Sequence, residues 1–260
     1  MNRHEILNLK QFVSLGKADL HIHSNYSDGR PTIQEILDYV EEKTDLNVIA
    51  ITDHDTAEGA LLASQLIKKK RYRFELIVGE EVTSLEGHII GLFLSKTIPP
   101  GMAAHQVLKE IHSQGGLAIA AHPFESTTIK NPDYLTMNGV GMLTLIREKN
   151  HFDGIETVNG TPTLRDENLQ AAFLNRALLF KAETGSSDAH IVEAIGKGYT
   201  LFEGKTKNDL RESIEHLQTQ SMYDRWGFRA LVKYLFFFIP KGLRMLGYTI
   251  VHGRSPKDRS

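Results

Sequence analysis

The sequence predicts an α/β protein whose strands close, or nearly close, into a barrel. Short apolar runs typical of buried parallel strands alternate with segments of helical periodicity. At least seven such strands fall within about 200 residues, which suits one sizeable domain. None of them is followed by Gly-x-Gly-x-x-Gly or a Walker sequence, which disfavours a doubly wound nucleotide-binding sheet. In α/β barrels the chemistry lies at the carboxyl ends of the strands.

The first half of the chain begins this alternation. A helix over residues 32–43 starts with the capping-box spacing of Thr32 and Glu35, and its apolar residues share one face. The run 47–51 is continuously apolar, as in a strand buried on both sides. In order, we expect a strand at 17–22, a helix at 32–43, a strand at 47–51, a helix at 56–70, and strands at 74–82 and 87–94.

The second half continues the pattern. The paired glycines Gly115 and Gly116 end a helix that starts near Ala103, whereas Gly139 and Gly141 weaken the helix predicted around them. In order, we expect a helix at 103–114, a strand at 117–121, a helix at 135–148, a strand at 152–158, a helix at 164–178, strands at 179–183 and 198–202, and a helix at 206–218. All of these strands are expected in one parallel sheet.

Composition limits the kinds of site the chain can carry. The sequence has no cysteine, so disulfides and thiolate metal sites are excluded. A metal would have to be held by His, Asp and Glu, which favours Zn²⁺, Mn²⁺ or Fe. No apolar signal segment follows Met1, so we expect a cytoplasmic location.

Polar residues gather just past the predicted strand ends. His21 and His23 lie one residue apart after the first strand, and side chains at i and i+2 of a strand share one side. A lone His-x-His is equally compatible with a polar turn. However, six of the 12 histidines fall in this set, together with three carboxylates, and only His88 lies at a strand start. Because one divalent ion takes four to six ligands, this many groups predict two or three ions. The set is His21, His23, Asp28, His54, Glu81, His88, His122, Asp188 and His190.

The short motifs that contain these residues, taken in their order along the chain, resemble those of the PHP (polymerase and histidinol phosphatase) family. The resemblance spans residues 19 to about 202 and looks closest to the stand-alone nucleotide-phosphatase and oligonucleotide-exonuclease branch. It implies a distorted (β/α)₇, TIM-like barrel with a C-terminal helical tail. The motifs are His21-x-His23 with Ser27-Asp28-Gly29, Thr52-Asp53-His54-Asp55, Gly79-x-Glu81, His88, Ala121-His122-Pro123, Ile155-Glu156-x-x-Asn159 and Ser187-Asp188-Ala189-His190.

The resemblance also implies a trinuclear site filled by Mn²⁺, Zn²⁺, Fe²⁺ or Mg²⁺. One ion would be held by His21, His23, Glu81 and Asp188. A second would share Glu81 with His88 and His122. The third would be held by Asp28, His54 and His190. Family members differ in how many of these positions are filled.

Several neighbouring residues are candidates for supporting roles. We expect turnover to require Asp53 as well as His54, Asp188 and His190. Asp19, Asp53 and Asp55 could orient ligands, although each also suits a cap or turn. Glu156 could be a site residue or a structural acceptor, and Glu80 is expected to be a solvated or capping acid. Remote phosphate binding is assigned to Arg165, Lys130 and Lys197.

The tail differs from the rest of the chain. From residue 223 onward there are eight Lys and Arg against two Asp and Glu, interleaved with aromatic residues, whereas the rest is acidic. The apolar run 234–239 is far shorter than the about 20 residues that span a bilayer. A helix on an anionic membrane surface, a terminal helix packed on the barrel or on a second subunit, and single-strand nucleic-acid binding stay open. We expect association of the tail with a membrane or a partner. The chain is thus divided into a lead-in (1–16), a barrel domain (17–218) and the tail (219–260).

The predicted function is metal-dependent phosphoester hydrolysis. Water bridging two metal ions has a pKa lowered toward about 7 and can attack phosphorus in line. The expected substrate is a phosphomonoester, namely a nucleotide or bisphosphonucleotide, or a short single-stranded oligonucleotide. The alternatives are a metallo-hydrolase that cuts C–N or C–O bonds and a non-catalytic, metal-stabilised binding domain.

Overall fold

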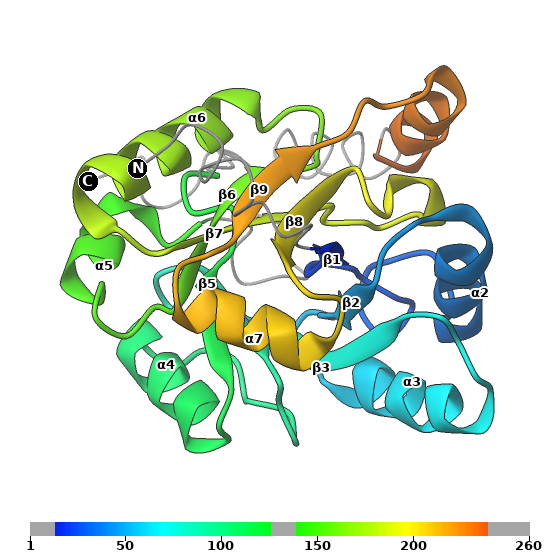
Figure 1. Cartoon of the computed structure of the whole chain (residues 1–260). Coiled ribbons are helices and arrows are strands. Elements are labelled where there is room, and N and C mark those ends of the chain that lie inside the picture. The colour runs from blue at the N-terminus through cyan, green and yellow to red at the C-terminus, as the bar shows by residue number, and fades with distance from the viewer. Residues whose placement is uncertain (1–13, 126–138, 239–260) are drawn as a thin grey trace, which may run out of the picture.

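The strands form one curved sheet. The computed structural model describes residues 14–125 and 139–238, and every structural statement below concerns these residues. Within them the sheet has nine strands in the order β7-β6-β5-β4-β3-β2-β1-β8-β9 (Figure 1). The strands are β1 (Leu15–Asp19), β2 (Val48–Ile51), β3 (Glu75–Thr83), β4 (His88–Leu92), β5 (Leu117–Ala120), β6 (Gly154–Asn159), β7 (Ala182–Ser186), β8 (Gly198–Glu203) and β9 (Gln220–Tyr223).

Helices surround the strands, as Figure 1 shows. They are α2 (Ile33–Lys43), α3 (Glu58–Lys69), α4 (Ala104–Ser113), α5 (Gly141–Arg147), α6 (Arg165–Leu174) with a π-helical extension η1 (Asn175–Leu179), a 3₁₀ turn η2 (Val192–Ala194), and α7 (Lys207–Glu215). A last helix covers residues 228–238. The predicted mixed α/β, barrel-like fold is confirmed, and the helices lie close to their predicted ranges. The strand β9 was not predicted.

The prediction of a wholly parallel sheet is wrong at β4 and β8, and the additional strand β9 is antiparallel as well. β1, β2 and β3 are parallel to one another, and so are β5, β6 and β7. β4 is antiparallel to both β3 and β5, β8 is antiparallel to β1, and β9 is antiparallel to β8. The reason at β4 is the length of its connection: residues 84–87 form a tight turn in which Ser84 N donates to Gly87 O (3.0 Å). A turn this short cannot hold the crossover that a parallel partner requires.

The ends of the sheet meet where β7 lies against β8 and β1. Ile22, just after β1, pairs in parallel with Ala189, just after β7. The Thr200 hydroxyl accepts from Gly185 N (2.9 Å) at this seam. A Cβ on Gly198 would lie 2.0 Å from Ser186 O, so only glycine lets these backbones approach so closely. The sheet therefore curves into a nearly closed barrel.

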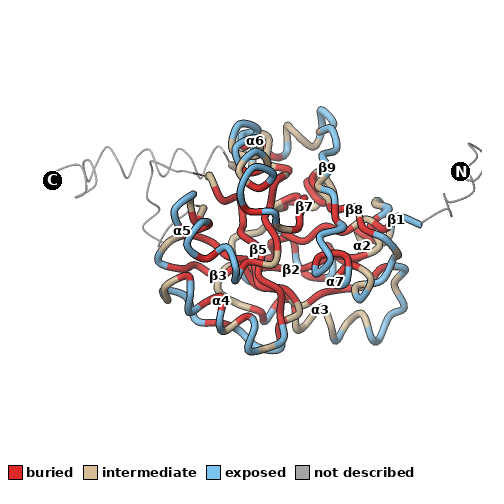
Figure 2. Tube along the Cα trace, turned by 60° about the vertical axis from the view of Figure 1, so that its left-hand side comes forward, coloured by how far each residue is buried: buried red, intermediate tan, exposed pale blue. Residues whose placement is uncertain are grey.

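Alternating side chains divide the core into an interior and an outer layer. Val48 and Ala50 of β2 point into the barrel, whereas Ile49 and Ile51 pack against α2 and α3. Figure 2 shows this as buried central strands inside a ring of partly exposed helices.

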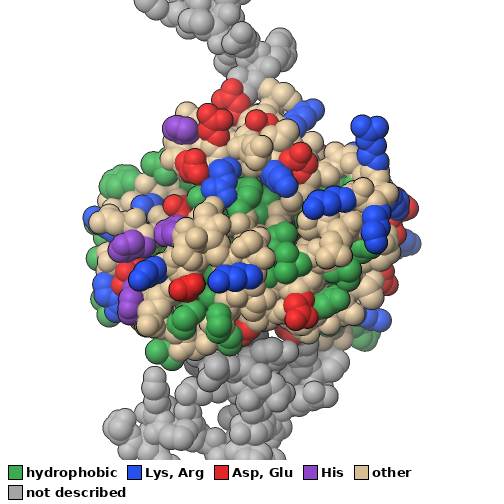
Figure 3. Space-filling view, turned by 90° about the horizontal axis from the view of Figure 1, so that it is seen from below, with side chains coloured by type: hydrophobic (Ala, Val, Ile, Leu, Met, Phe, Trp, Pro, Cys, Tyr) green, Lys and Arg blue, Asp and Glu red, His purple; other side chains and the backbone are tan. Residues whose placement is uncertain are grey.

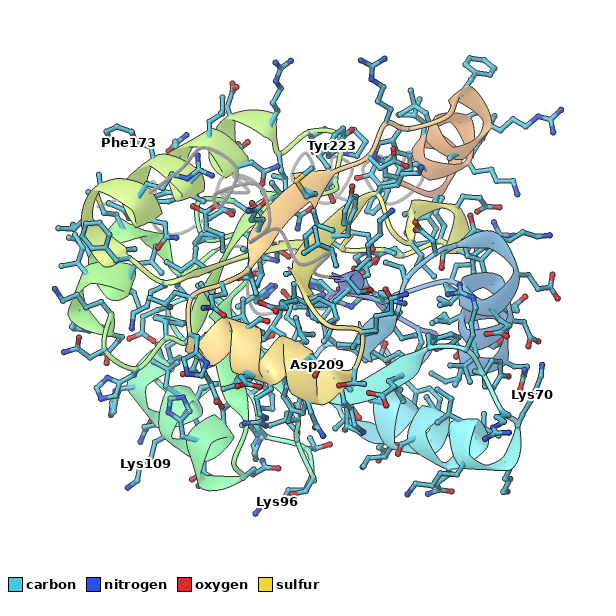
Figure 4. The ribbon with its side chains drawn as sticks, viewed as in Figure 1. Lys70, Lys96, Lys109, Phe173, Asp209 and Tyr223 are labelled. Carbon is cyan, nitrogen blue, oxygen red and sulfur yellow. The ribbon has the colours of Figure 1, made fainter. Side chains whose placement is uncertain are left out.

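One end of the barrel is closed by α7. Leu210 and Ile214 of this helix are fully buried among the interior side chains. The helix begins with a capping box in which Thr206 and Asp209 cap each other's backbone N–H; Asp209 is labelled in Figure 4. The labelled lysines Lys70, Lys96 and Lys109 lie at the periphery in the same view and are exposed. Among the described residues, α7 thus fills one end of the barrel interior, which leaves the opposite end for a site.

Some of the predicted segments lie outside the described residues. These include most of the lead-in, residues 135–138 of one predicted helix, Lys130, and the tail beyond residue 238. The proposed division into three segments stays a prediction. Within the described residues, no helix is both long and apolar enough to cross a membrane.

Candidate metal centre

All nine predicted ligands lie together at the end of the barrel opposite α7. The carboxyl ends of β1, β2, β3, β5 and β7 carry most of them. His88 joins them although it begins β4, because β4 is antiparallel and its first residue lies beside the last residue of β3, Thr83. The puzzling position of His88 in the sequence is therefore a consequence of strand direction.

The opening motif behaves as predicted although its strand ends early. β1 ends at Asp19, two residues before His21. The bridge between Ile22 and Ala189 keeps the chain extended past that point. The rings of His21 and His23 are both fully buried, with centroids 4.9 Å apart. Both rings face the same carboxylates.

Glu81 occupies the centre of the cluster, and its side chain is 1% exposed. Its Oε1 lies 2.9 Å from His122 Nε2 and 3.0 Å from His88 Nδ1. Its Oε2 lies between 3.1 and 3.3 Å from ring nitrogens of three further histidines, His21, His54 and His23. One carboxylate thus gathers five imidazoles.

Asp188 and Asp28 join the remaining histidines. Asp188 Oδ1 lies 3.2 Å from His23 Nε2 and 3.5 Å from His190 Nδ1. Asp28 Oδ1 lies 3.0 Å from His190 Nε2 and 3.9 Å from both His54 Nε2 and His23 Nδ1. The turn 24–29 therefore carries Asp28 from the buried histidine pair to the more exposed side of the cluster.

The donor set fits divalent cations. Four overlapping groups have ligand atoms within 4.8 Å of one another. Neither buried ring nitrogen of His23 has a hydrogen bond within the described residues, although Nε2 faces two carboxylates. Burying imidazole nitrogens without hydrogen bonds is costly, and cations would satisfy them. The groups are His21, His23 and Glu81; His54, Glu81 and His88; His21, His122 and Asp188; and His23, Asp28, His54 and His190.

Charge favours cation binding at the same place. Burial opposes ionisation of Glu81, but the neighbouring histidines hold its pKa well below the ordinary value. The pKa of Asp188 is lowered in the same way, chiefly by His21. Burial lowers the pKa of His54 to about 3, so this imidazole is neutral. Burial by itself would lower the pKa of His122, but the charge of Glu125 raises it to about 10. A cation bound at His122 must therefore displace a proton.

Glu156 is a buried acceptor that orients ligands. Its Oε1 lies 3.2 Å from His21 Nδ1 and accepts from the Ser186 hydroxyl. Its Oε2 accepts from His122 N (2.7 Å) and Asn159 Nδ2 (3.0 Å). When His21 Nδ1–H donates to Glu156, the lone pair of Nε2 points into the cluster. Two roles were left open for Glu156, and these contacts support that of a structural acceptor.

Three aspartates fasten the loops that carry the ligands. Asp53 accepts from Ser24 N, Ser24 Oγ and Ser27 Oγ at 2.6–2.7 Å, which fixes the turn before Asp28. Asp55 accepts from Thr83 N and Oγ1, next to Glu81 in β3. Asp19 accepts from Ser187 N (2.9 Å) and Gly196 N (2.8 Å). Both carboxylate oxygens of Asp53 are engaged in the turn, so its geometry suits positioning; the catalytic role expected for it stays a prediction.

Two neighbours of the cluster were not assigned ligand-orienting contacts from the sequence. Glu125 Oε2 lies 3.0 Å from His122 Nδ1, and its place three residues after the histidine is the signal that could have found it. Asn159, which was noted only as part of a motif, donates from Nδ2 to Asp188 Oδ2 (3.1 Å) as well as to Glu156. This leaves Asp188 Oδ1 facing the histidines.

Glu80 is a correction. It was expected to be a solvated or capping acid, but it is fully buried and accepts from Ile98 N (2.9 Å). Side chains alternate along β3, so Glu80 points away from Glu81. Burial raises the pKa of Glu80 to about 8.

Two of the three candidate phosphate-binding residues, Lys197 and Arg165, have no contact with the cluster among the described residues. Lys197 Nζ donates to Asp224 Oδ2 (2.8 Å) and to Arg225 O (3.1 Å), which ties it to the segment after β9. Arg165 is exposed at the start of α6, after β6. Lys130 lies outside the described residues. Substrate contact by these residues stays a prediction.

Histidines outside the set lie on the surface, as expected. His105, His112, His151 and His216 are exposed, and histidine side chains are visible on the face shown in Figure 3. His4 and His252 are not among the described residues. A histidine is therefore not a sign of the centre by its residue type alone. The histidines of the centre are distinguished by their positions at strand ends.

The comparisons with known proteins point to one family. A family model described as PHP-associated matches residues 167–219. An uncharacterized protein of Methanocaldococcus jannaschii is 42% identical over 118 residues, which are 42% of this chain and 68% of that protein. The 5'-3' exoribonuclease of Haemophilus influenzae is 37% identical over 107 residues, which are 40% of this chain and 38% of that protein.

The fold gives the same result. A two-domain protein of Bacteroides vulgatus, described as containing a predicted PHP-like metal-dependent phosphoesterase, superposes with a TM-score of 0.61 at 21% identity. The match covers 81% of this chain and 65% of that one. The chain therefore belongs to the PHP (polymerase and histidinol phosphatase) family.

Proposed function

We propose that this chain hydrolyses a phosphate ester of a nucleotide, a bisphosphonucleotide or a short oligonucleotide, with two or three divalent cations at the histidine cluster. The observation that carries the proposal is Glu81, whose two oxygens face five imidazoles at 2.9–3.3 Å. A carboxylate with ligand groups on both sides is suited to bridging cations. The similarity to an exoribonuclease supports a nucleotide-type substrate.

The residues would divide into ligands and supports. When bound, divalent cations activate water and neutralise the charge of a phosphate group. His21, His23, Glu81 and Asp188 would hold the innermost cation, and Glu156 and Asn159 would keep their ligand atoms aimed at it. The side chains of His21, His23 and Glu81 are at most 1% exposed, so bulk water is excluded from their side of the cluster.

The acidic body favours a small substrate. On the face shown in Figure 3, Lys and Arg side chains are interspersed with Asp and Glu. A long nucleic acid needs an extended basic surface to neutralise its phosphates. We therefore propose release of phosphate or single nucleotides rather than cleavage within long strands.

The test is a phosphate-release assay with measured metal content. The purified protein is loaded with Mn²⁺ and given nucleotides, bisphosphonucleotides and 5'-phosphorylated short oligonucleotides, with and without chelator. We expect turnover that the chelator abolishes. His54→Ala and Asp188→Ala should each abolish turnover without unfolding the protein, and His105→Ala, on the exposed surface of α4, should leave it unchanged.

The outcomes separate the alternatives. Full metal content with no activity on any phosphoester would overturn the proposal and leave the C–N or C–O hydrolase and the non-catalytic binding domain. Activity retained in His54→Ala or Asp188→Ala would remove that residue from the site.

A further inference from the structure

Among the described residues, the cluster is more exposed on one side than on the other. His21, His23 and Glu81 are at most 1% exposed in their side chains. On the other side, Asp28 and Asp188 are each 13% exposed, His54 is 14% exposed and His190 is 10% exposed. A substrate must therefore approach past His190 and its neighbours.

The helix 228–238 lies at this approach. The ring centroid of Phe238 is 5.6 Å from that of His190, and the ring centroid of Phe237 is 6.1 Å from it. Both phenylalanines are half-buried, so part of each side chain stays accessible. Aromatic rings thus stand directly beside a predicted cation ligand.

Several contacts with the barrel and within the tail hold this helix in place. Trp226 Nε1 donates to Gly160 O (2.8 Å), and Lys233 pairs with Glu193. Tyr234 is 9% exposed, and its ring is 4.4 Å from Phe238 and 5.0 Å from Trp226. These contacts fix the two phenylalanines beside His190.

The opposite face of the helix is different. Phe236 is 73% exposed and Leu235 is 47% exposed, whereas Tyr234, Phe237 and Phe238 face the barrel. The direction of each ring follows from its position on the helix. Phe236 therefore offers a matched control for Phe238 within one helical turn.

We propose that the helix 228–238 forms an aromatic wall of the substrate pocket, in which Phe237 and Phe238 receive the flat ring of a nucleoside whose phosphoester lies on the cluster. Phenylalanine offers nothing to a phosphate group, but it stacks favourably on any nucleobase. This inference rests on the proposed function and narrows its substrate to nucleotides with a base near the reacting phosphate.

The test compares substrates with and without a base in the metal-loaded protein. Trp226 is the single tryptophan of the chain and touches the aromatic wall, so its fluorescence reports binding independently of turnover. AMP should bind about tenfold or more tightly than ribose 5-phosphate, by the usual strength of base stacking. Phe238→Leu, which keeps an apolar side chain, should remove most of this preference and leave ribose 5-phosphate binding unchanged. Phe236→Leu should change neither.

Two results would overturn the wall. One is equal affinity of the wild-type protein for AMP and ribose 5-phosphate. The other is an equal loss for both ligands in Phe238→Leu, which would indicate a purely structural role beside His190. The proposed function is tested separately. If the protein binds AMP preferentially in the fluorescence titration but hydrolyses no phosphoester, the aromatic wall is supported and the proposed activity is contradicted. If it hydrolyses AMP and ribose 5-phosphate equally well, the activity is supported and the aromatic wall is contradicted.

Discussion

The two ends of the barrel are built from the same strands but hold opposite kinds of side chain. Along β4, His88, Ile90 and Leu92 lie on the same face of the strand; His88 belongs to the metal centre and Leu92 to the apolar core next to α7. Along β3, Ile77 and Glu81 also lie on one face of the strand; Ile77 belongs to the apolar core and Glu81 to the metal centre. At one end, α7 covers the interior with Leu210 and Ile214, and at the other end buried imidazoles surround a carboxylate.

The comparison teaches where stability and chemistry reside. Burying apolar side chains stabilises the fold, whereas burying histidines and carboxylates costs free energy unless they are paired or bind cations. Substitutions at the α7 end should therefore change the free energy of unfolding, and those at the histidine end should change metal affinity and turnover.

The largest effect is expected from Glu81→Gln. It removes the charge that faces five imidazoles, and we expect turnover to fall by about 1,000-fold or more, because the cations supply several kcal/mol of transition-state stabilisation. Metal content per chain, measured by mass spectrometry, should fall as well. Glu80→Gln is the matched control on the opposite face of β3; its pKa is already raised to about 8, so the amide should preserve activity. Equal losses in both variants would contradict the assignment.

At the other end of the barrel, Leu210→Ala should act on stability alone. Leu210 is completely buried (0% exposed). Truncating such a leucine to alanine costs about 2–5 kcal/mol of unfolding free energy. Chemical denaturation measures this loss, and kcat/KM of the folded fraction should be unchanged. Leu169→Ala, in α6 and 64% exposed, should cost little. A loss of turnover in folded Leu210→Ala would mean that the two ends are coupled.

A smaller effect is expected from Glu156→Gln. All four groups that contact this carboxylate can donate hydrogen bonds, so an amide nitrogen would face a donor and loosen His21. Losing a hydrogen-bond partner of a metal ligand usually lowers metal affinity by about 10–100-fold. Metal titration with a competing chelator measures it. Glu183→Gln, which only breaks a surface pair with Arg176, is the control; unaltered affinity in Glu156→Gln would show that His21 needs no partner.

The smallest effect is expected from Thr206→Ala at the start of α7. The substitution removes the side-chain acceptor for Asp209 N, and a lost N-cap costs about 1 kcal/mol. The denaturation midpoint should shift slightly, with metal affinity and turnover unchanged. A change in metal affinity would show that the α7 end contributes to the histidine end.

Sequence patterns predicted the alternating elements, and ordered motifs predicted the nine residues that meet at one end. Local rules sufficed for α2, where Thr32 and Glu35 form the predicted capping box, and for α7, which begins close to its predicted start. They did not suffice for β4, because an apolar run does not state its direction. They also failed for Glu80, since neighbouring carboxylates in a strand look alike until one face is assigned to the interior.

The sequence by itself determined the donor chemistry: with no cysteine, only His, Asp and Glu could form a metal centre, and their positions after apolar runs placed them at strand ends. The family resemblance implied that Glu81 is shared, but only the tertiary structure decided which side chains surround it. Glu81 became central because strands from distant parts of the chain curve around it, and His88 reached it because β4 runs antiparallel. The tertiary structure likewise placed Phe237 and Phe238 beside His190, since contact between a C-terminal helix and a strand end depends on packing over a long sequence separation, which no local pattern encodes.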